Sequence, residues 1–216
     1  IGYAWGYMKN HQTESGTEKR RLFIAFPLPE DVQEHLEQIQ KRLETLVPQP
    51  VFRWVNPANT HVTLHFLGDI PEKEIPSVTA AIQEAAGDGV IRCRLGGIGF
   101  FPAGRRPRVV WLGVNEMQSR RVPDLNAQGR KIYHVLEQSL TAAGIESDSP
   151  RYTPHITLGY RLRKADPGDV DNAAAAWRRE FDPKGLIFTL RSIVLFESTV
   201  ENGKRKYLPL HTEPLH

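Results

Sequence analysis

The chain has 216 residues, with 28 Lys and Arg against 25 Asp and Glu, and a formal net charge of +3 at pH 7. Its hydrophobic share of 40% and charged share of 25% are ordinary for a globular protein, which excludes a disordered or low-complexity chain. No apolar run reaches the roughly 18 residues of a membrane span, and the single Cys93 excludes an internal disulfide and is expected to be a buried structural thiol. The expected location is therefore the reducing cytoplasm, and no membrane partner is expected.

Hydrophobic periodicity and Gly and Pro breaks predict the elements in chain order. Residues 1–19 are mostly polar and are expected to form a flexible extension, and residues 20–216 a single bilobal domain. Strands are expected at residues 22–28, 60–67, 91–100, 109–114, 155–158, 186–197 and 205–210, the last two joined across Asn202-Gly203. Helices are expected at residues 30–46, 76–86, 123–143 and 170–181. This order indicates an α+β fold with mostly antiparallel strands.

Nearly the same four residues occur twice, as His61-Val62-Thr63-Leu64 and His155-Ile156-Thr157-Leu158. Both copies alternate polar and apolar residues after a turn-forming segment, which is typical of a half-buried strand. With a period of two, the His and Thr of each copy share one face, while the apolar residues, including Phe66, pack into the core. By the same alternation, His65 is expected to line a groove or the surface beside His61.

Two imidazoles, each with a hydroxyl beside it, are the groups that metal-free phosphodiester cleavage requires. Free imidazole has a pKa of about 6.5, so one can accept a proton while the other donates one. Hydroxyl donors can stabilise charge on the phosphate oxygens. The sequence therefore predicts an enzyme whose catalytic residues are His61, His155, Thr63 and Thr157, with no metal and no cofactor. The competing interpretation, ordinary strand residues at these positions, stays open.

The stretch Phe52-Arg53-Trp54-Val55-Asn56-Pro57, followed by residues 61–68, resembles the 2H phosphoesterase superfamily. Within it, the chain resembles most the RNA 2′,3′-cyclic phosphodiesterases, also called 2′-5′ RNA ligases. Residues 21–29 and 152–158 show the same likeness, so the resemblance spans about residues 20–213. It implies a bilobal, pseudo-twofold fold with mostly antiparallel sheets around a central groove and helices on the outer faces.

The resemblance also implies the reaction. The partners would be RNA ends bearing a 2′,3′-cyclic phosphate, tRNA fragments for example, or small cyclic nucleotides. The product would be a 2′-phosphomonoester, with reversible 2′-5′ ligation as a related activity. His61 would be the proton donor and His155 the acceptor, although the residues alone leave that assignment open because the two motifs are nearly identical. A monomer is expected.

Four further residues are candidates for substrate binding. Phe26 and Trp54 could stack a base, although large aromatic residues usually belong to cores. Members of the family commonly have Arg two positions after the second His-x-Thr-Leu, where this chain has Tyr160. By strict alternation, Arg161 would lie on the face of His155 and could supply the missing cation.

Two other functions stay open. One is a phosphodiesterase that acts on 2′-5′ linkages or a small cyclic nucleotide with the same fold, and residues 102–107 and 161–169 would decide between these substrates. The other is a non-catalytic module that binds RNA ends. Paired His and Thr at both motifs count against a pure binding module, because binding alone does not require two imidazoles.

Overall fold

The computed structural model describes residues 18–87, 89–117, 128–149, 151–181 and 185–216. The expected flexible extension lies outside these ranges up to residue 17, and so does the expected start of a helix at Pro123. Lys19, which the sequence assigned to the extension, is instead the first residue of a strand and pairs with Pro71.

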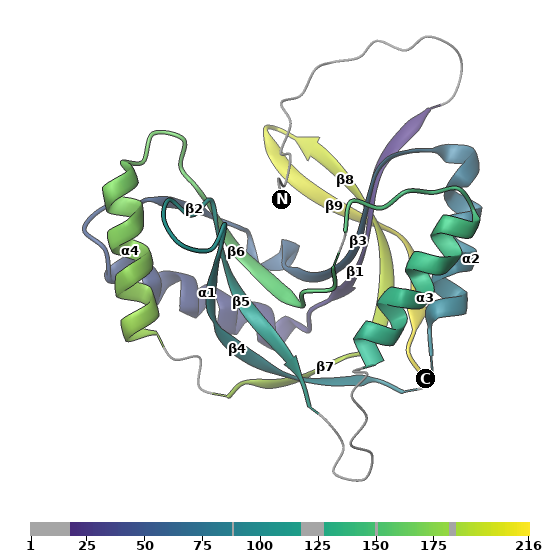
Figure 1. The fold of residues 1–216 in the computed structure, drawn as a ribbon, viewed down its shortest axis with the longest axis horizontal. Coiled ribbons are helices and arrows are strands. Elements are labelled where there is room, and N and C mark those ends of the chain that lie inside the picture. Colours follow the sequence, from purple (N-terminus) through teal and green to yellow (C-terminus); the bar gives the residue numbers. More distant parts are fainter. Residues whose placement is uncertain (1–17, 88, 118–127, 150, 182–184) are drawn as a thin grey trace.

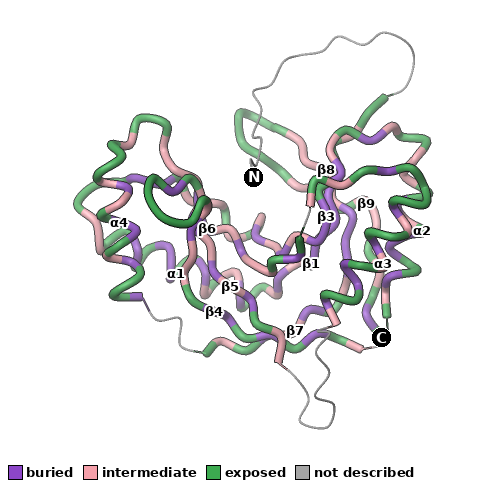
Figure 2. The backbone as a smooth tube through the Cα atoms, in the orientation of Figure 1, coloured by how far each residue is buried: buried purple, intermediate pink, exposed green. Residues whose placement is uncertain are grey.

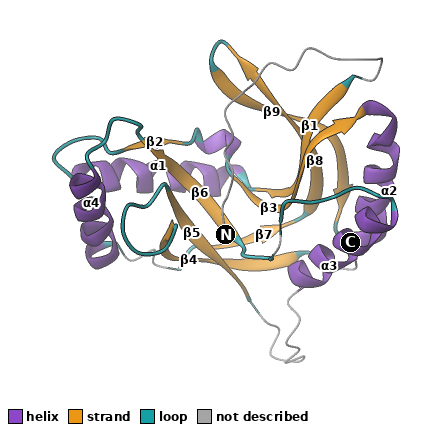
Figure 3. Ribbon diagram, turned by 45° about the horizontal axis from the view of Figure 1, so that its top comes forward, coloured by secondary structure: helices purple, strands orange, loops and turns teal. Residues whose placement is uncertain are grey.

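The strands form one antiparallel sheet of nine strands in the order β7-β4-β5-β6-β3-β1-β8-β9, with β2 paired to β6. Their bounds are β1 (Lys19–Pro27), β2 (Phe52–Trp54), β3 (His61–Pro71), β4 (Ile91–Phe101), β5 (Val109–Glu116), β6 (His155–Arg161), β7 (Ile187–Leu190), β8 (Ser192–Glu201) and β9 (Lys204–Pro214). The sheet curls into a half-barrel (Figures 1 and 3). The predicted α+β class is therefore confirmed.

Four α-helices of the described chain lie outside the curled sheet, two on each side (Figure 1). Their bounds are α1 (Glu30–Thr45), α2 (Ile75–Ala85), α3 (Gln128–Ala142) and α4 (Pro167–Glu180), and the short 3-10 helices are η1 (Pro57–Asn59) and η2 (Glu72–Glu74). The α1 helix follows Pro29 and buries the stripe that its period predicts, made of Val32, Leu36, Ile39 and Leu43. This helix is the longest of the described ones, at 16 residues, and no described helix is suited to crossing a membrane.

The expected strand at residues 186–197 is two strands. β7 ends at Leu190 and pairs with β4, whereas β8 begins at Ser192 and pairs with β1. β7 therefore lies at one end of the sheet order and β8 next to the other end, an arrangement that a single straight strand could not give. The hairpin across Asn202-Gly203 is confirmed, with both residues at positive φ, as a two-residue turn between right-twisted strands requires.

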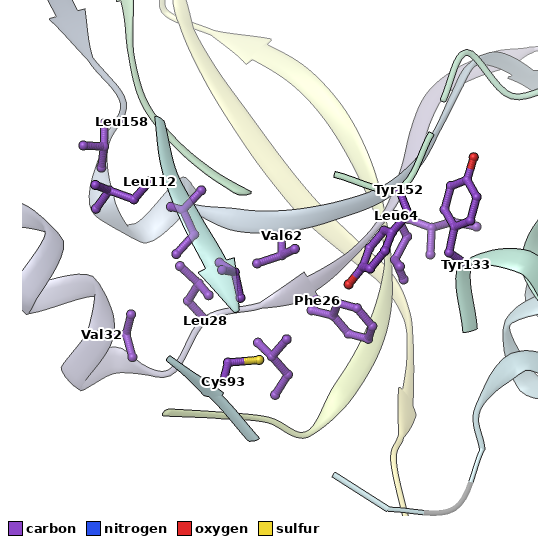
Figure 4. Close-up of a cluster of buried hydrophobic side chains, with 14 of the residues drawn as sticks. Phe26, Leu28, Val32, Val62, Leu64, Cys93, Leu112, Tyr133, Tyr152 and Leu158 are labelled. Carbon is purple, nitrogen blue, oxygen red and sulfur yellow. The ribbon is translucent and has the colours of Figure 1, made fainter. Parts of the chain in front are cut away.

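The hydrophobic core lies between the sheet and the helices and uses alternate residues of the central strands (Figure 4). Val62 and Ile156 are both 0% exposed, and the tube in Figure 2 changes between purple and pink along these strands and is green on the outer helix faces. Cys93 is also fully buried, and burial raises the pKa of its thiol to about 12, as expected of a structural cysteine. Because one face of the central strands is filled by this core, their polar residues must face the other way.

Candidate active site

The two His-x-Thr motifs lie on adjacent strands at the centre of the sheet. β3 and β6 pair antiparallel with Val62 opposite Ile156. This register places His61 across from Thr157 and Thr63 across from His155, all on the face opposite the core. Diagonal neighbours on such a face lie about 7–8 Å apart, which leaves room for a phosphate group between the two imidazoles.

Each imidazole is held by the backbone two residues before it. Nδ1 of His61 donates to the carbonyl oxygen of Asn59 at 2.8 Å, and Nδ1 of His155 donates to that of Thr153 at 2.6 Å. A carbonyl oxygen only accepts, so Nδ1 carries the hydrogen in both residues. The neutral form of each ring therefore keeps Nε2 as its basic nitrogen, and this is the nitrogen available for proton transfer.

Aromatic rings surround both imidazoles. The ring centre of His61 lies 4.8 Å from that of Phe23 and 5.3 Å from that of Tyr207. His155 has Phe101 at 5.2 Å and Trp111 at 5.8 Å, both edge-on. These rings cover part of each imidazole, so both histidines are half-buried, and burial disfavours the charged form of a histidine.

Burial accordingly lowers the pKa of both histidines. Burial lowers the pKa of His61 to about 4. The hydrogen bond to Asn59 raises this pKa by a smaller amount, and the nearby charge of His155 lowers it. Burial also lowers the pKa of His155, although the hydrogen bond to Thr153 raises it by a smaller amount. Both imidazoles are therefore neutral in the free protein at pH 7. A phosphate anion between them would favour the protonated form of one.

Trp111 reaches its place beside His155 because the residue opposite it in β4 is Gly99. A Cβ atom added at Gly99 would lie 2.2 Å from the indole ring, so the ring occupies the space that any larger residue would fill. The ring of Phe101 stacks on the same indole at 5.0 Å. The sequence alone did not predict that Trp111 and Phe101 lie beside His155.

A β-bulge follows the His-Thr pair in both strands. In β3, Thr63 pairs with Ala25 and His65 with Ile24, which leaves Leu64 as the extra residue. In β6, Thr157 pairs with Trp111 and Gly159 with Val110, which leaves Leu158 as the extra residue. A bulge shifts the alternation of faces by one residue. On the face that carries His61, Thr63, His155 and Thr157 (the catalytic face), each motif therefore places a different residue than simple alternation predicts.

Comparison with known proteins shows the family of this chain. The chain matches the family described as LigT like phosphoesterase over residues 26–111 and 122–205. An RNA 2′,3′-cyclic phosphodiesterase of Aquifex aeolicus is 31% identical over 159 residues, 73% of this chain and 79% of that protein. One of Thermus thermophilus is 32% identical over 199 residues, 86% of this chain and 94% of that protein. The chain belongs to the LigT-like phosphoesterase family.

Solved structures share the fold of this LigT-like phosphoesterase. A protein of Thermus thermophilus has a TM-score of 0.69 at 26% identity, covering 90% of this chain and 97% of that one. Escherichia coli LigT, solved with 3′-AMP, has a TM-score of 0.64 at 22% identity, covering 92% and 99%, a likeness of fold alone. Family and fold together confirm the predicted enzyme class and the pseudo-twofold architecture.

The bulge in β3 overturns two expectations for this LigT-like phosphoesterase. His65 is 0% exposed and does not line a groove, since its Nδ1 accepts from Ser147 Oγ at 2.8 Å and its Nε2 donates to the Tyr133 carbonyl at 2.9 Å. Its ring stacks on Tyr133 at 4.4 Å, so it is a structural histidine. Phe66 is 41% exposed instead of buried, and it lies beside Phe23 on the catalytic face.

The bulge in β6 overturns the expectation for Arg161. Tyr160 pairs with Val109 and Thr157 with Trp111, and Val109 and Trp111 are two residues apart in β5. Tyr160 therefore shares the face of Thr157, and its hydroxyl is hydrogen-bonded to that threonine. Arg161, one residue further, lies on the opposite face and does not supply a cation beside His155.

Of the two aromatic residues proposed for base stacking, Phe26 lies in the core. Phe26 is 0% exposed in the core and pairs with Val62, so it cannot stack a base. Phe23, three residues earlier and on the other face of β1, is the ring that lies beside His61. The alternation of Leu22, Ile24 and Phe26 could have revealed this. Trp54 is half-buried, 5.6 Å from the ring of Trp177, and its contact with substrate stays a prediction.

Two other features bear on where a bound group could lie. A surface cavity of about 230 Å³ lies between the end of α1 and α4, lined by residues such as Val47, Gln49 and Asp169, and it contains none of the paired His and Thr. Among the described residues, no cluster of three or more His, Cys, Asp or Glu side chains is arranged to hold a metal ion.

Proposed function

We propose that this chain hydrolyses the terminal 2′,3′-cyclic phosphate of RNA to a 2′-phosphomonoester, without a metal. The observation that carries the proposal is the crossed arrangement of His61, Thr157, Thr63 and His155 on one face of β3 and β6. The names of the relatives, RNA 2′,3′-cyclic phosphodiesterases, support the substrate class.

In the proposed reaction, Nε2 of His155 accepts a proton from water as the water oxygen attacks phosphorus. A new P–O bond forms, the bond from phosphorus to the ribose 3′-oxygen breaks, and Nε2 of His61 gives its proton to that oxygen. Diagonal placement of the two imidazoles suits this reaction, since base and acid must act on opposite sides of the phosphate. A general acid or base of this kind contributes about 10²- to 10⁴-fold to the rate.

The hydroxyls of Thr63 and Thr157 donate to the non-bridging phosphate oxygens as negative charge develops there. The bond between Tyr160 and Thr157 would orient the second hydroxyl before substrate binds. The assignment of His61 as donor and His155 as acceptor rests on the family resemblance. The same displacement, with the 5′-hydroxyl of a second RNA in place of water, would join the two RNAs by a 2′-5′ bond, and the ribose 3′-oxygen would again leave. The cytoplasmic location and the monomeric state remain predictions.

The pH dependence of kcat/KM is expected to be bell-shaped with its maximum below about pH 6.5, the ordinary pKa of imidazole. The acceptor must be neutral, so activity falls as pH drops below its pKa; the donor must be protonated, so activity falls as pH rises above its pKa. Both pKa values are lowered in the free protein, which moves both limbs toward acid. The basic limb of kcat should lie at higher pH, because the bound phosphate raises the pKa of the donor. Initial rates across the pH range check this, and a single ionisation in kcat/KM would contradict it.

The decisive experiment is product analysis on a short RNA ending in a 2′,3′-cyclic phosphate, with and without EDTA. The expected product is the 2′-phosphate, formed at the same rate in both conditions. A 3′-phosphate product would mean that the 2′-oxygen leaves instead. Loss of the rate in EDTA, with recovery on adding zinc or manganese, would place the chemistry on a metal. Hydrolysis of a 2′-5′ dinucleotide, with no hydrolysis of the cyclic phosphate, would favour the 2′-5′ linkage as the substrate. Tight binding of the RNA without turnover would favour a binding module.

A further inference from the structure

The catalytic centre is nearly symmetric, but its two ends differ. The bulges at Leu64 and Leu158 turn Phe66 and Tyr160 to equivalent places, each three residues after the Thr of its motif. One end of the catalytic face is therefore marked by Phe66 and the other by Tyr160. Any asymmetry between these ends would decide which way a directional substrate such as RNA lies.

At the Tyr160 end, Arg53 lies directly across from Tyr160 in the β2–β6 pair. Directly opposite residues of an antiparallel pair share a face, so Arg53 faces the same side as Tyr160 and Thr157. Arg53 is exposed and forms no ion pair with any carboxylate of the described residues. Its guanidinium can therefore bind an anion without first breaking a salt bridge.

Arg205 reaches the same end of the site from β9. Its Nη1 donates to Ser198 Oγ at 2.8 Å, and its carbonyl oxygen accepts from Asn59 Nδ2 at 3.0 Å, which joins β9 to the turn that holds His61. Arg205 alternates with Tyr207 and so shares the face of the ring that contacts His61. Burial and neighbouring Tyr207 raise the pKa of Tyr160 to about 12, while the charges of Arg205 and Arg53 lower it, so both charges act on the phenol.

The Phe66 end has a different chemistry. The ring of Phe66 is apolar and exposed. At this end β3 is bonded to residues 148 and 149, whereas β6 is bonded to β2 at the other end. The Asp148 N–H donates to the Phe66 carbonyl oxygen, and the Phe66 N–H donates to Ser149 Oγ. On this side of β3 the residues bonded to Phe66 are thus an acidic and a neutral one, whereas on the corresponding side of β6 the residue across from Tyr160 is an arginine.

We propose that Arg53 and Arg205 form a phosphate-binding subsite at the Tyr160 end, which fixes the direction in which RNA lies across the two histidines. Guanidinium groups bind phosphate through charge-assisted and often bidentate hydrogen bonds. A substrate held in one direction presents its leaving oxygen to one imidazole only. The subsite would thereby give two nearly equivalent histidines different roles. This inference rests on the proposed function.

The test compares Arg53→Gln, Arg205→Gln and the double variant with the wild type. Lys206→Gln is the matched control, because Lys206 adjoins Arg205 on the other face of β9 and pairs with Glu201 at 3.0 Å. Two substrates are used: adenosine 2′,3′-cyclic phosphate, with one phosphate, and a dinucleotide ending in a 2′,3′-cyclic phosphate, with two. Each Arg→Gln change is expected to raise KM for the dinucleotide about tenfold, as loss of a charge-assisted contact does, with kcat within about twofold. Lys206→Gln should leave KM unchanged.

The two substrates identify which phosphate is bound. A rise in KM confined to the dinucleotide places the subsite on the internucleotide phosphate, and an equal rise with the mononucleotide places it on the reacting one. Unchanged KM values for both substrates, or an equal effect of Lys206→Gln, would overturn the proposal. If the wild type hydrolyses neither substrate, the proposed function fails. The subsite is then tested by calorimetric titration of a dinucleotide 3′-phosphate into wild type and variants, where equal Kd values would reject it.

Discussion

Replacing His61 or His155 with Ala should lower kcat by at least about 100-fold, the smallest contribution expected of a general acid or base. Each histidine supplies a proton-transfer step that the other cannot, because each Nδ1 is fixed to a backbone carbonyl, and His65, the other histidine of β3, is buried with its Nε2 bonded to Tyr133. The measurement is steady-state hydrolysis of an RNA 2′,3′-cyclic phosphate. The double variant should be little slower than either single one, since the two groups act as a unit.

His134→Ala is the matched control, because this histidine lies exposed on α3, where it contacts Glu137 and none of the paired residues. It should leave kcat unchanged. Circular dichroism and thermal melts should show that the His61 and His155 variants remain folded. More than about a tenth of wild-type activity in either variant, well inside the loss expected for a general acid or base, would rule out the two-histidine mechanism.

Replacing Thr63 or Thr157 with Val should lower kcat by about 100-fold, with a smaller change in KM, because a hydroxyl aimed at developing charge acts mainly in the transition state. Valine keeps the shape and the strand preference of threonine, so the loss would report the hydroxyl. Rates with the same RNA substrate measure it.

Serine at either position serves as the control, because it keeps the hydroxyl and loses only a methyl group. Thr63→Ser and Thr157→Ser should retain most of the activity. If the valine variants stay within about threefold of wild type, far from the effect of losing an oxyanion donor, the threonines are strand formers and the charge is stabilised by other groups.

The sequence by itself determined the features that depend on short-range pattern. Apolar residues two positions apart predict the strands that carry the repeated His-x-Thr motif. Apolar residues three and four positions apart predict the buried stripe of α1. The core contacts of Val62 and Ile156 follow from the same alternation. The hairpin at Asn202-Gly203 follows from local turn chemistry.

Only the tertiary structure decided which residues surround the motifs. A bulge arises from pairing with a neighbouring strand, so nothing within β3 or β6 alone revealed that alternation fails at Leu64 and Leu158. That single-residue shift buried His65 and brought Tyr160 to the catalytic face in place of Arg161. The lowered pKa of His61 likewise depends on burial by rings from β1 and β9, and Asn59 meets Arg205 across 146 residues of chain. The burial and the charge state of the histidines depend on these long-range contacts, which the order of residues along one strand does not specify.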